Sequence, residues 1–496
     1  MDQAILAVDL GSGSLRAGAV TAAGRVIAHS RVPIAASESR PGWSELDPEI
    51  WWRALRSASA RILRRLPRSC RIAGICIAAV TRTQIFLDRD GKSLRPAVLF
   101  RDSRAALDAD DLARYFATDN PADAITPFHP IARLGWLHRT ETDLFDRLAA
   151  VLEPKDYLNF RLTGAMARDA VTYSRFDALR PSGSMPPWLA RGLETLVAGE
   201  RVMPWIPVGS VASGEEPFDA LAGIPVFGGS MDSWAAAVGS GAARQGQAYD
   251  IGGTSEVVGQ LTARRASAPG LVSLVWTEAC SQLGGPTQVG ADCARWAHEA
   301  FRVKGDLAVA AERTGARPPD EGLPLFLPYL SGERAPLWRA DVRGVFLGVS
   351  RVHTGEDLFW ATLQGVGLAV ADVLDTSVRA SGESPSEVFL SGGGARSDAW
   401  CQMKADILGL PAIRCGHAET GLLGCAMAGA VGLGSYPTIA AAAAAMSPAE
   451  RVFEPRRELA DFHAARAAAY RQAKAVALAV ADENRRRVRH HKPIAV

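Results

Sequence analysis

A short stretch in which one aspartate precedes glycines and small hydroxyl residues occurs twice in this chain, about half a sequence apart. DLGSGS begins at Asp9 and DIGGTS begins at Asp250; each follows an apolar run and precedes residues typical of a strand. This arrangement predicts two β-hairpins with glycine-rich turns. Two similar halves that open on the same hairpin indicate a duplicated domain with a cleft between the copies.

The first hairpin has the groups that a phosphate site needs. A glycine-rich turn exposes successive backbone N–H groups, and such a concavity binds anions, most often phosphate. Asp9 would repel phosphate directly, but Mg²⁺ can bridge a carboxylate to phosphate oxygens. Arg16 adds a charge-assisted donor for the group in transfer. One such turn alone is more often an ordinary hairpin, and the second copy strengthens the prediction of a nucleotide site.

Three later stretches add to this hypothesis. Asp232 follows a strand and a Gly-Gly turn, where it suits a helix N-cap or, at a cleft, accepts the proton of a sugar hydroxyl that attacks phosphorus. FLSGGGARSDAW (389–400) ends a strand in glycines, which let a flat group such as adenine approach the backbone. The small residues of 418–434 favour a helix that packs closely across a domain interface.

Other segments predict layers of strands and helices. Residues 71–80 and 386–394 have the pattern of short buried strands, and 354–378 that of a buried helix. Residues 47–66 have apolar positions at helical spacing, with Asp47 as N-cap and Pro48 at the first helical position. These patterns indicate an α/β protein. The basic end, 484–493, predicts a frayed and solvated terminus.

Length and composition limit the function classes. The 496 residues suffice for two or three domains, and the small polar stretch 240–247 divides them into predicted domains 1–245 and 246–496. A formal net charge of +2 gives no reason to expect nucleic acid. The sequence shows neither a signal-peptide pattern nor an uncharged apolar run near the ~18 residues of a membrane helix. Seven cysteines without zinc-site spacing predict buried, reduced thiols in a cytoplasmic protein.

Eight segments resemble, in order, those of the FGGY family of carbohydrate kinases, and the likeness is greatest to the xylulokinase branch. They are DLGSGSLRAG, PGWSELDPEIWW, LRPAVLFRDSRA, LEPKDYLNFRLTG, GGSMDSWAAAVG, DIGGTSEVVG, FLPYLSGERAPLWRADVRGVFLGVS and SGGGARSDAW. The resemblance covers nearly the whole chain. It implies an α/β fold of duplicated actin/hexokinase/Hsp70-like ATPase domains, of ribonuclease H-like type, flanking a cleft.

The resemblance also implies roles for individual residues. Asp232 matches the catalytic base and Asp9 the Mg²⁺-linked acid. The nucleotide is assigned to Gly11, Ser12, Gly13, Arg16, Gly252, Gly253, Thr254, Gly393, Gly394 and Ala395. The sugar side is assigned to Arg82, Thr83, Phe100, Asp102 and Asp232, with Phe100 where the family usually has tryptophan. ATP and Mg²⁺ are therefore the expected cofactors, and a homodimer is the expected assembly.

Some positions depart from the family pattern. Ser12 replaces a threonine and keeps its hydroxyl, whereas Glu256 replaces a small residue of xylulokinases. Xylulokinases carry Gln-Met-His-Gly where this chain has VTRT (80–83), and the missing histidine argues against xylulose itself. Arg82 could hydrogen-bond the hydroxyls of a linear polyol or pair with the carboxylate of a sugar acid. Its structural alternative is a salt bridge to a neighbour such as Asp102.

These observations favour ATP-dependent phosphorylation of a hydroxyl on a small sugar or polyol, such as D-xylulose or a related ketose. An actin-like ATP-binding sugar sensor or scaffold with weak catalysis is the alternative that the fold alone would permit. A dehydrogenase is disfavoured, because GSGSLRAG leads into a second strand instead of a helix.

Overall fold

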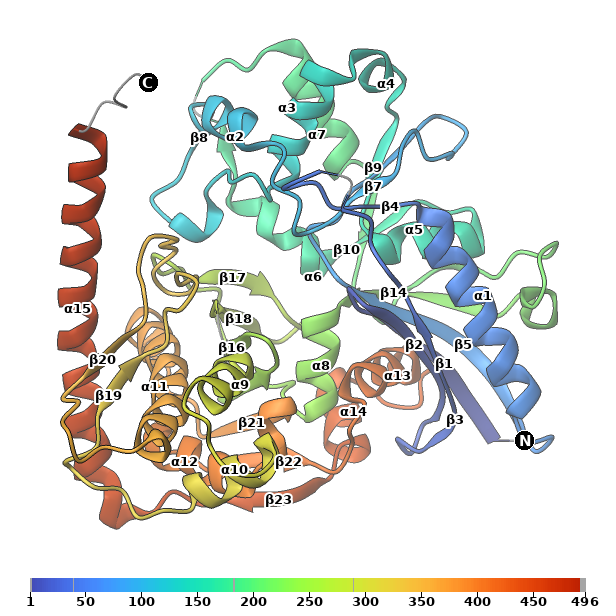
Figure 1. Cartoon of the computed structure of the whole chain (residues 1–496). Coiled ribbons are helices and arrows are strands. Elements are labelled where there is room, and N and C mark those ends of the chain that lie inside the picture. The colour runs from blue at the N-terminus through green and yellow to red at the C-terminus, as the bar shows by residue number, and fades with distance from the viewer. Residues whose placement is uncertain (1, 39, 182, 289, 491–496) are drawn as a thin grey trace.

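The computed structural model describes residues 2–38, 40–181, 183–288 and 290–490. Two sheets dominate it, and we call the parts that pack around them the first and the second lobe (Figure 1). The first sheet has the order β13-β14-β5-β1-β2-β3 and the second β17-β18-β16-β15-β21-β22-β23. The first comprises β1 (Asp2–Leu10), β2 (Ser14–Thr21), β3 (Val26–Pro33), β5 (Cys70–Ala79), β13 (Pro207–Ser210) and β14 (Pro225–Met231). The second comprises β15 (Gln247–Gly252), β16 (Glu256–Thr262), β17 (Val272–Val275), β18 (Ser281–Pro286), β21 (Glu387–Gly392), β22 (Ala412–Cys415) and β23 (Ala449–Phe453).

Both sheets contain the same five-stranded unit. In β3-β2-β1-β5-β14 the first two pairings are antiparallel and the next two parallel. The strands β18-β16-β15-β21-β22 repeat that pattern. The predicted duplication, the two hairpins and the α/β class are therefore confirmed. The domain boundary at 245 stays a prediction, and β15 begins two residues after it, at Gln247.

Helices cover both sheets and fill the space between them. They are α1 (Pro48–Arg65), α2 (Ala106–Ala113), α3 (Pro130–Thr140), α4 (Thr142–Arg147), α5 (Pro154–Thr163), α6 (Ala170–Tyr173), α7 (Pro187–Val197), α8 (Asp232–Ser240), α9 (Ala291–Ala300), α10 (Leu307–Gly315), α11 (Gly355–Ser381), α12 (Asp398–Leu408), α13 (Thr420–Gly432), α14 (Ile439–Met446) and α15 (Ala460–His490). As predicted, the Asp47 side chain caps α1 by accepting from the Glu49 N–H, and Pro48 stands at its first position.

Short strand pairs complete the structure. They are β4 (Glu45–Leu46) with β7 (Ala97–Val98), β6 (Ile85–Leu87) with β9 (Ala150–Leu152), β8 (Phe116–Ala117) with β11 (Arg180–Pro181), β10 (Ala167–Asp169) with β12 (Glu200–Val202), and β19 (Leu325–Leu327) with β20 (Val345–Leu347). Between β5 and β14 the chain forms a helical region with its own apolar core, which stands at the top of Figure 1.

Helices α8 and α13 join the lobes through backbone contacts. A Cβ on Gly239 would lie 1.9 Å from the Thr420 carbonyl oxygen, and one on Gly424 would lie 2.0 Å from that of Ala235. Both helices contribute to an apolar core that also contains residues of β1 and β15, such as Ile5 and Tyr249. The small residues of 418–434 therefore pack across the lobe interface, as predicted.

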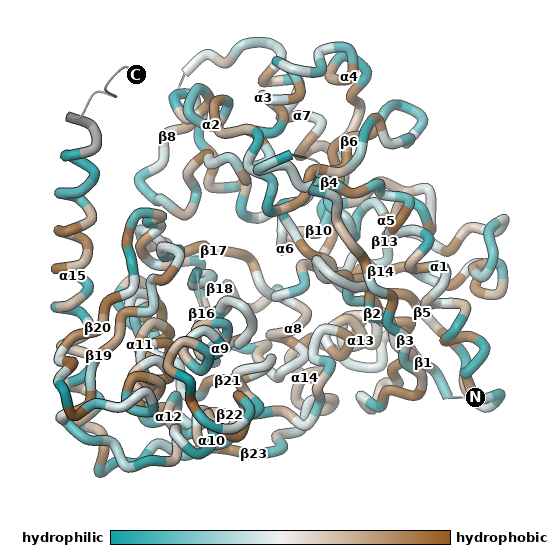
Figure 2. Tube along the Cα trace, viewed as in Figure 1, coloured by the Kyte–Doolittle hydropathy of each residue, from teal (hydrophilic) through white to brown (hydrophobic). Residues whose placement is uncertain are grey.

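Helix α11 is long and apolar enough to cross a membrane by length and composition alone, but 94% of the relevant window is buried inside the protein. The predicted fraying of the basic end is wrong as far as His490, because α15 continues to that residue, whereas the exposure of residues 484–487 agrees with a solvated end. Figure 2 shows apolar colour along the middle of α15 and polar colour toward its C-terminal end. Residues 491–493 lie outside the described residues.

All seven cysteines have free thiols, and all are buried, as predicted.

Candidate active site

Three neighbouring strand ends bring the predicted catalytic carboxylates to one edge of the first sheet. Asp9 on β1 is in register with Ala78 on β5, and Ala79 on β5 is in register with Met231 on β14. Adjacent strands lie about 4.8 Å apart. Asp9 and Asp232, the first residue of α8, therefore flank the segment that follows β5.

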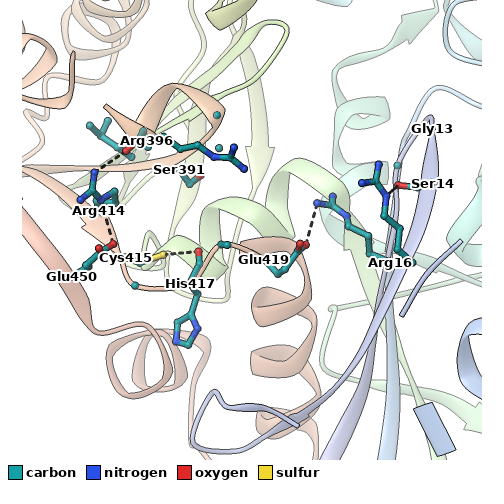
Figure 3. A pocket seen from close by; sticks show the side chains of 18 of the residues that line it. Gly13, Ser14, Arg16, Ser391, Arg396, Arg414, Cys415, His417, Glu419 and Glu450 are labelled. Atoms are coloured by element: carbon teal, nitrogen blue, oxygen red, sulfur yellow. Dashed lines mark hydrogen bonds and ion pairs between the residues drawn. The ribbon is translucent and has the colours of Figure 1, made fainter. Parts of the chain in front are cut away.

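Asp9 is held between the two lobes. It is 3% exposed, and its Oδ2 accepts a hydrogen bond from Arg16 Nη2 at 2.5 Å. Arg16 Nη1 lies 3.2 Å from Glu419 Oε2, so the arginine connects the first lobe to the second (Figure 3). A Cβ on Gly421 would lie 2.3 Å from Asp9 Oδ2, which is why α13 can approach so closely. Burial raises the pKa of Asp9, and the Arg16 charge opposes that rise.

Asp232 has the protonation behaviour of a general base. Burial, and then the negative charge of Asp9, raise its pKa to about 7. The Ser233 N–H donates to Asp232 Oδ1 at 2.8 Å and, with the Arg16 charge, limits the rise. A carboxylate with this pKa takes up a proton more readily than an exposed one near neutral pH.

Both predicted phosphate turns present free backbone donors. In each turn one N–H closes the hairpin: Gly11 donates to the Ser14 carbonyl, and Gly253 donates to that of Ser255, both at 3.0 Å. Within the described part of the chain, the next two N–H groups of each turn have no acceptor; they belong to Ser12, Gly13, Thr254 and Ser255. Gly11 and Gly253 therefore shape the turns, and the following residues carry the donors.

A cavity of about 810 Å³ lies between the lobes. Gly11, Ser12 and Gly13 line it from the first lobe, and Gly393 and Ala395 line it from the second. Cavities of 300–1,000 Å³ are usual for ligands the size of a nucleotide. Sequence reasoning missed several of its titratable residues, which come from β3, β22, β23 and the segments that follow β21 and β22: Arg31, Arg396, Arg414, His417, Glu419 and Glu450.

The glycines of the predicted adenosine segment pack against the second phosphate turn. A Cβ on Gly392 would lie 2.2 Å from the Gly252 carbonyl oxygen, and one on Gly252 would lie 3.3 Å from Gly394 Cα. Gly252 and Gly394 are therefore packing positions, whereas Gly393 and Ala395 face the cavity. The glycines thus let two loops meet backbone to backbone.

The aspartate of the second hairpin is paired differently from Asp9. Lys404 Nζ lies 2.5 Å from Asp250 Oδ2 and 3.4 Å from Glu256 Oε2, and all three side chains are at most 4% exposed. Burial and the Asp250 charge raise the pKa of Glu256 well above its usual value, and the Lys404 charge opposes that rise.

The residues around Asp9 fit a magnesium ion held mainly by phosphate and water. Mg²⁺ usually keeps several waters and takes one or two carboxylates besides substrate phosphates. Among the described residues no group of three or more His, Cys, Asp or Glu side chains forms a metal cluster. Asp9 Oδ1 is buried and has no hydrogen-bond partner in that part of the chain. It is the kind of single carboxylate oxygen that such an ion requires.

The segment after β5 is fixed by Glu153. The Arg82 N–H donates to Glu153 Oε1 at 3.2 Å and the Thr83 N–H to Oε2 at 3.1 Å. Arg82 has a φ of 55°, in the left-handed region that non-glycine residues seldom occupy. Thr83 is fully buried and its hydroxyl donates to the Thr81 carbonyl at 3.5 Å, so it supports the loop.

Asp102 supports the fold and does not pair with Arg82. It is fully buried, its oxygens accept from the side-chain and backbone N–H groups of Arg104, and Oδ2 also accepts from the Ser44 N–H at 2.6 Å. The structural alternative for Arg82, a salt bridge to Asp102, is therefore not formed. Phe100 is half-buried, with the Arg101 guanidinium 5.2 Å from its ring centre. Sugar contacts by Thr83, Phe100 and Asp102 stay predictions.

Comparison with known proteins agrees with this architecture. Residues 4–179 match the N-terminal domain of the FGGY family of carbohydrate kinases, and residues 248–433 match the C-terminal domain of that family. A xylulose kinase of Klebsiella pneumoniae is 33% identical over 82% of this chain and 85% of its own. A gluconokinase of Bacillus subtilis is 26% identical over 82% and 83%.

A solved structure shows the same fold. A kinase from Brucella ovis, described as a xyloylose kinase, superposes with a TM-score of 0.84 at 26% identity and covers 96% of this chain and 99% of its own. The two lobes, their duplicated sheets and the cleft between them are thus those of a known enzyme class. This chain belongs to the FGGY family of carbohydrate kinases.

Proposed function

We propose that this kinase transfers the γ-phosphoryl group of ATP to a hydroxyl of a small sugar or polyol, with Asp232 as general base. The observation that carries the proposal is the placement of Asp232, whose pKa is raised to about 7, at the same sheet edge as Asp9 and the first glycine turn. The free N–H groups of both turns and the Arg16 guanidinium suit the phosphates of a nucleotide.

The reaction balances without any other reactant. Asp232 takes the proton of the acceptor hydroxyl as its oxygen bonds to the γ-phosphorus, and the bond from that phosphorus to the β–γ bridging oxygen breaks. The products are a sugar phosphate and ADP. Asp9 would hold Mg²⁺ through Oδ1, and the ion, when bound, neutralises charge on the phosphates.

The contact between Arg16 and Glu419 supports a role for lobe closure. Arg16 belongs to the first lobe and Glu419 precedes α13, so the ion pair forms only when the two lobes lie together. Closure would exclude water, which otherwise competes with the sugar for the phosphoryl group.

A coupled ADP-release assay tests this function. Ketoses, polyols and sugar acids are offered one at a time with ATP and Mg²⁺, and at least one is expected to stimulate ADP release far above the sugar-free rate. A sensor or scaffold would bind ATP without such stimulation, and family membership favours the enzyme. D-xylulose as substrate, a homodimer and a cytoplasmic location stay predictions.

A further inference from the structure

Arg82 has a guanidinium without an ionic partner in a pocket crowded with other cations. No side-chain hydrogen bond or ion pair joins it to another residue in the part of the chain that the structure describes. The guanidinium lies over the ring of Trp338, whose centre is 6.0 Å from Arg82 Cζ. Trp338 belongs to the second lobe, so both lobes border this guanidinium.

Two further arginines, Arg175 and Arg334, lie near enough that their charges, after burial, lower the pKa of Arg82 to about 10. Arg175 Nη2 donates to Glu153 Oε1 at 2.6 Å, the same oxygen that accepts the Arg82 backbone N–H. Arg334 comes from the second lobe and donates to the Thr287 carbonyl at 2.6 Å. The Nε atoms of Arg175 and Arg334 are buried and have no partner among the described residues. Unused cationic donors from both lobes thus converge on one place.

The neighbouring acids do not neutralise this cluster. Glu153 is occupied by Arg175 and by two backbone N–H groups. Burial raises the pKa of Glu333 to about 8, so the acid beside Arg334 is protonated at neutral pH. Asp123 lines the pocket, accepts from Asn120 Nδ2 at 3.1 Å and has a pKa raised by burial. Three guanidinium charges therefore face at most two carboxylates.

The remaining polar lining is neutral and small. Burial, followed by the charges of Arg82 and Arg175, lowers the pKa of His129 well below its usual value, and its Nδ1 accepts the Ile131 N–H at 3.2 Å. An enclosed cavity of about 30 Å³ lies among Arg82, Arg175, His129 and Asp123. That volume holds about two water-sized groups, which matches the two oxygens of a carboxylate and is too small for a whole sugar.

The cluster lies beside the proposed catalytic base. Ser230, two residues before Asp232, donates its hydroxyl to Asp169 Oδ1 at 3.1 Å. Asp169 caps α6, and Arg175 is the second residue after that helix. Arg82 follows the end of β5 and Asp232 follows the end of β14, and these two strand ends are paired in register. The cluster and the proposed base therefore come from the same edge of the first sheet.

We propose that Arg82, Arg175 and Arg334 bind the carboxylate of a polyhydroxy acid, and that the acceptor of this kinase is a sugar acid in place of a neutral ketose or polyol. The inference rests on the proposed function and specifies its substrate class. A guanidinium binds a carboxylate through two parallel N–H donors. Acids with a neutral counterpart of the same carbon chain therefore give the sharpest comparison.

The test compares kcat/KM within matched pairs: D-gluconate with D-glucitol, and D-xylonate with xylitol, with D-xylulose as the neutral ketose. For at least one acid, kcat/KM is expected to exceed that of its neutral partner and that of D-xylulose by about 100-fold. A factor of this size corresponds to the free energy of one strong hydrogen-bonded charge pair. A neutral compound used as well as or better than every acid would overturn the inference. The kinase assignment would survive that result, because ADP release would still depend on an added acceptor.

Variants on both lobes locate the carboxylate site. R82M is expected to lower the acid-to-neutral ratio of kcat/KM about 100-fold, and R334M repeats the test without touching the strained backbone of Arg82. Arg89, exposed on the same lobe, provides the matched control R89M, which should leave the ratio unchanged. An unchanged ratio in both folded variants would overturn the site.

Binding separates this inference from failure of the catalytic proposal. Calorimetry with the D232N protein measures the affinity for D-gluconate and D-xylonate in the absence of turnover. Binding of one acid that weakens in R82M/D232N, and that is absent for its neutral partner, supports the site even if no acceptor is phosphorylated. Failure of both acids to bind overturns it.

Discussion

The two glycine-rich hairpins have the same strand order, yet their aspartates lie in different surroundings. The Asp9 side chain pairs with Arg16, which is 36% exposed and reaches Glu419 across the lobe interface. The Asp250 side chain pairs with Lys404, which is 4% exposed and belongs to the same lobe. The first pair borders the cleft and the second is buried beneath its turn, although each aspartate keeps one buried oxygen without a hydrogen-bond partner among the described residues.

This difference indicates that the two copies kept the same strand order while their aspartates took on different roles. The first copy keeps a carboxylate and a cation where they can act on a ligand. The second copy uses the equivalent aspartate in a buried ion pair, which supports the turn that presents Thr254 and Ser255. Substitutions that remove one charge should therefore affect turnover in the first copy and stability in the second.

The largest expected effect follows from removal of the base. D232N should reduce kcat at least about 10³-fold, because the amide cannot accept the hydroxyl proton, while calorimetry should find ATP binding nearly unchanged. The control is D110N, which removes an exposed carboxylate on α2. Normal turnover by D232N would show that another residue is the base.

The next effect is a loss of stability in the second lobe. K404M should lower the free energy of unfolding by about 3–5 kcal/mol at pH 8, because it leaves Asp250 buried without its cation. Urea denaturation measures the change. A decrease below about 1 kcal/mol would contradict a structural role for this pair.

The matched substitution in the first lobe, R16M, should affect turnover more than stability. R16M is expected to lower kcat about 100-fold, as for the loss of one donor to a developing charge, and to cost less stability than K404M because Arg16 is partly exposed. The same urea series and the ADP-release assay compare both variants. Equal stability losses with unchanged turnover in R16M would remove the distinction between the hairpins.

The smallest effect concerns the stability cost of the base itself. The folded-state pKa of Asp232 is raised, so its ionised form disfavours folding, and that cost is present above about pH 7 and absent below about pH 4. D232N should therefore raise the free energy of unfolding by about 1–2 kcal/mol at pH 8 and hardly at all at pH 4. D110N, at an exposed position, should show no such pH-dependent gain.

The sequence predicted the hairpins, the helix cap and the α/β class because these features depend on short local patterns. The Asp47 cap and the glycine turns depend on neighbours within a few positions. The small residues of α13 form a local pattern too, although their partners on α8 and β1 lie far away in the chain. Contacts across the chain were missed: Glu419 meets Arg16 at a separation of 403 residues, and Arg334 lies near Arg82. The assignment of Asp102 to the sugar comes from resemblance to the family and stays a prediction; the pattern alone did not reveal the ion pair that Asp102 forms with Arg104.

The pH dependence of kcat/KM for the best acceptor tests the central claim most directly. With Asp232 as base, kcat/KM should rise with pH along an acidic limb whose apparent pKa lies near 7. In R16M this limb should move to higher pH, because the Arg16 charge lowers the pKa of Asp232. A profile that is flat from pH 5.5 to 8 in the native enzyme would contradict the account.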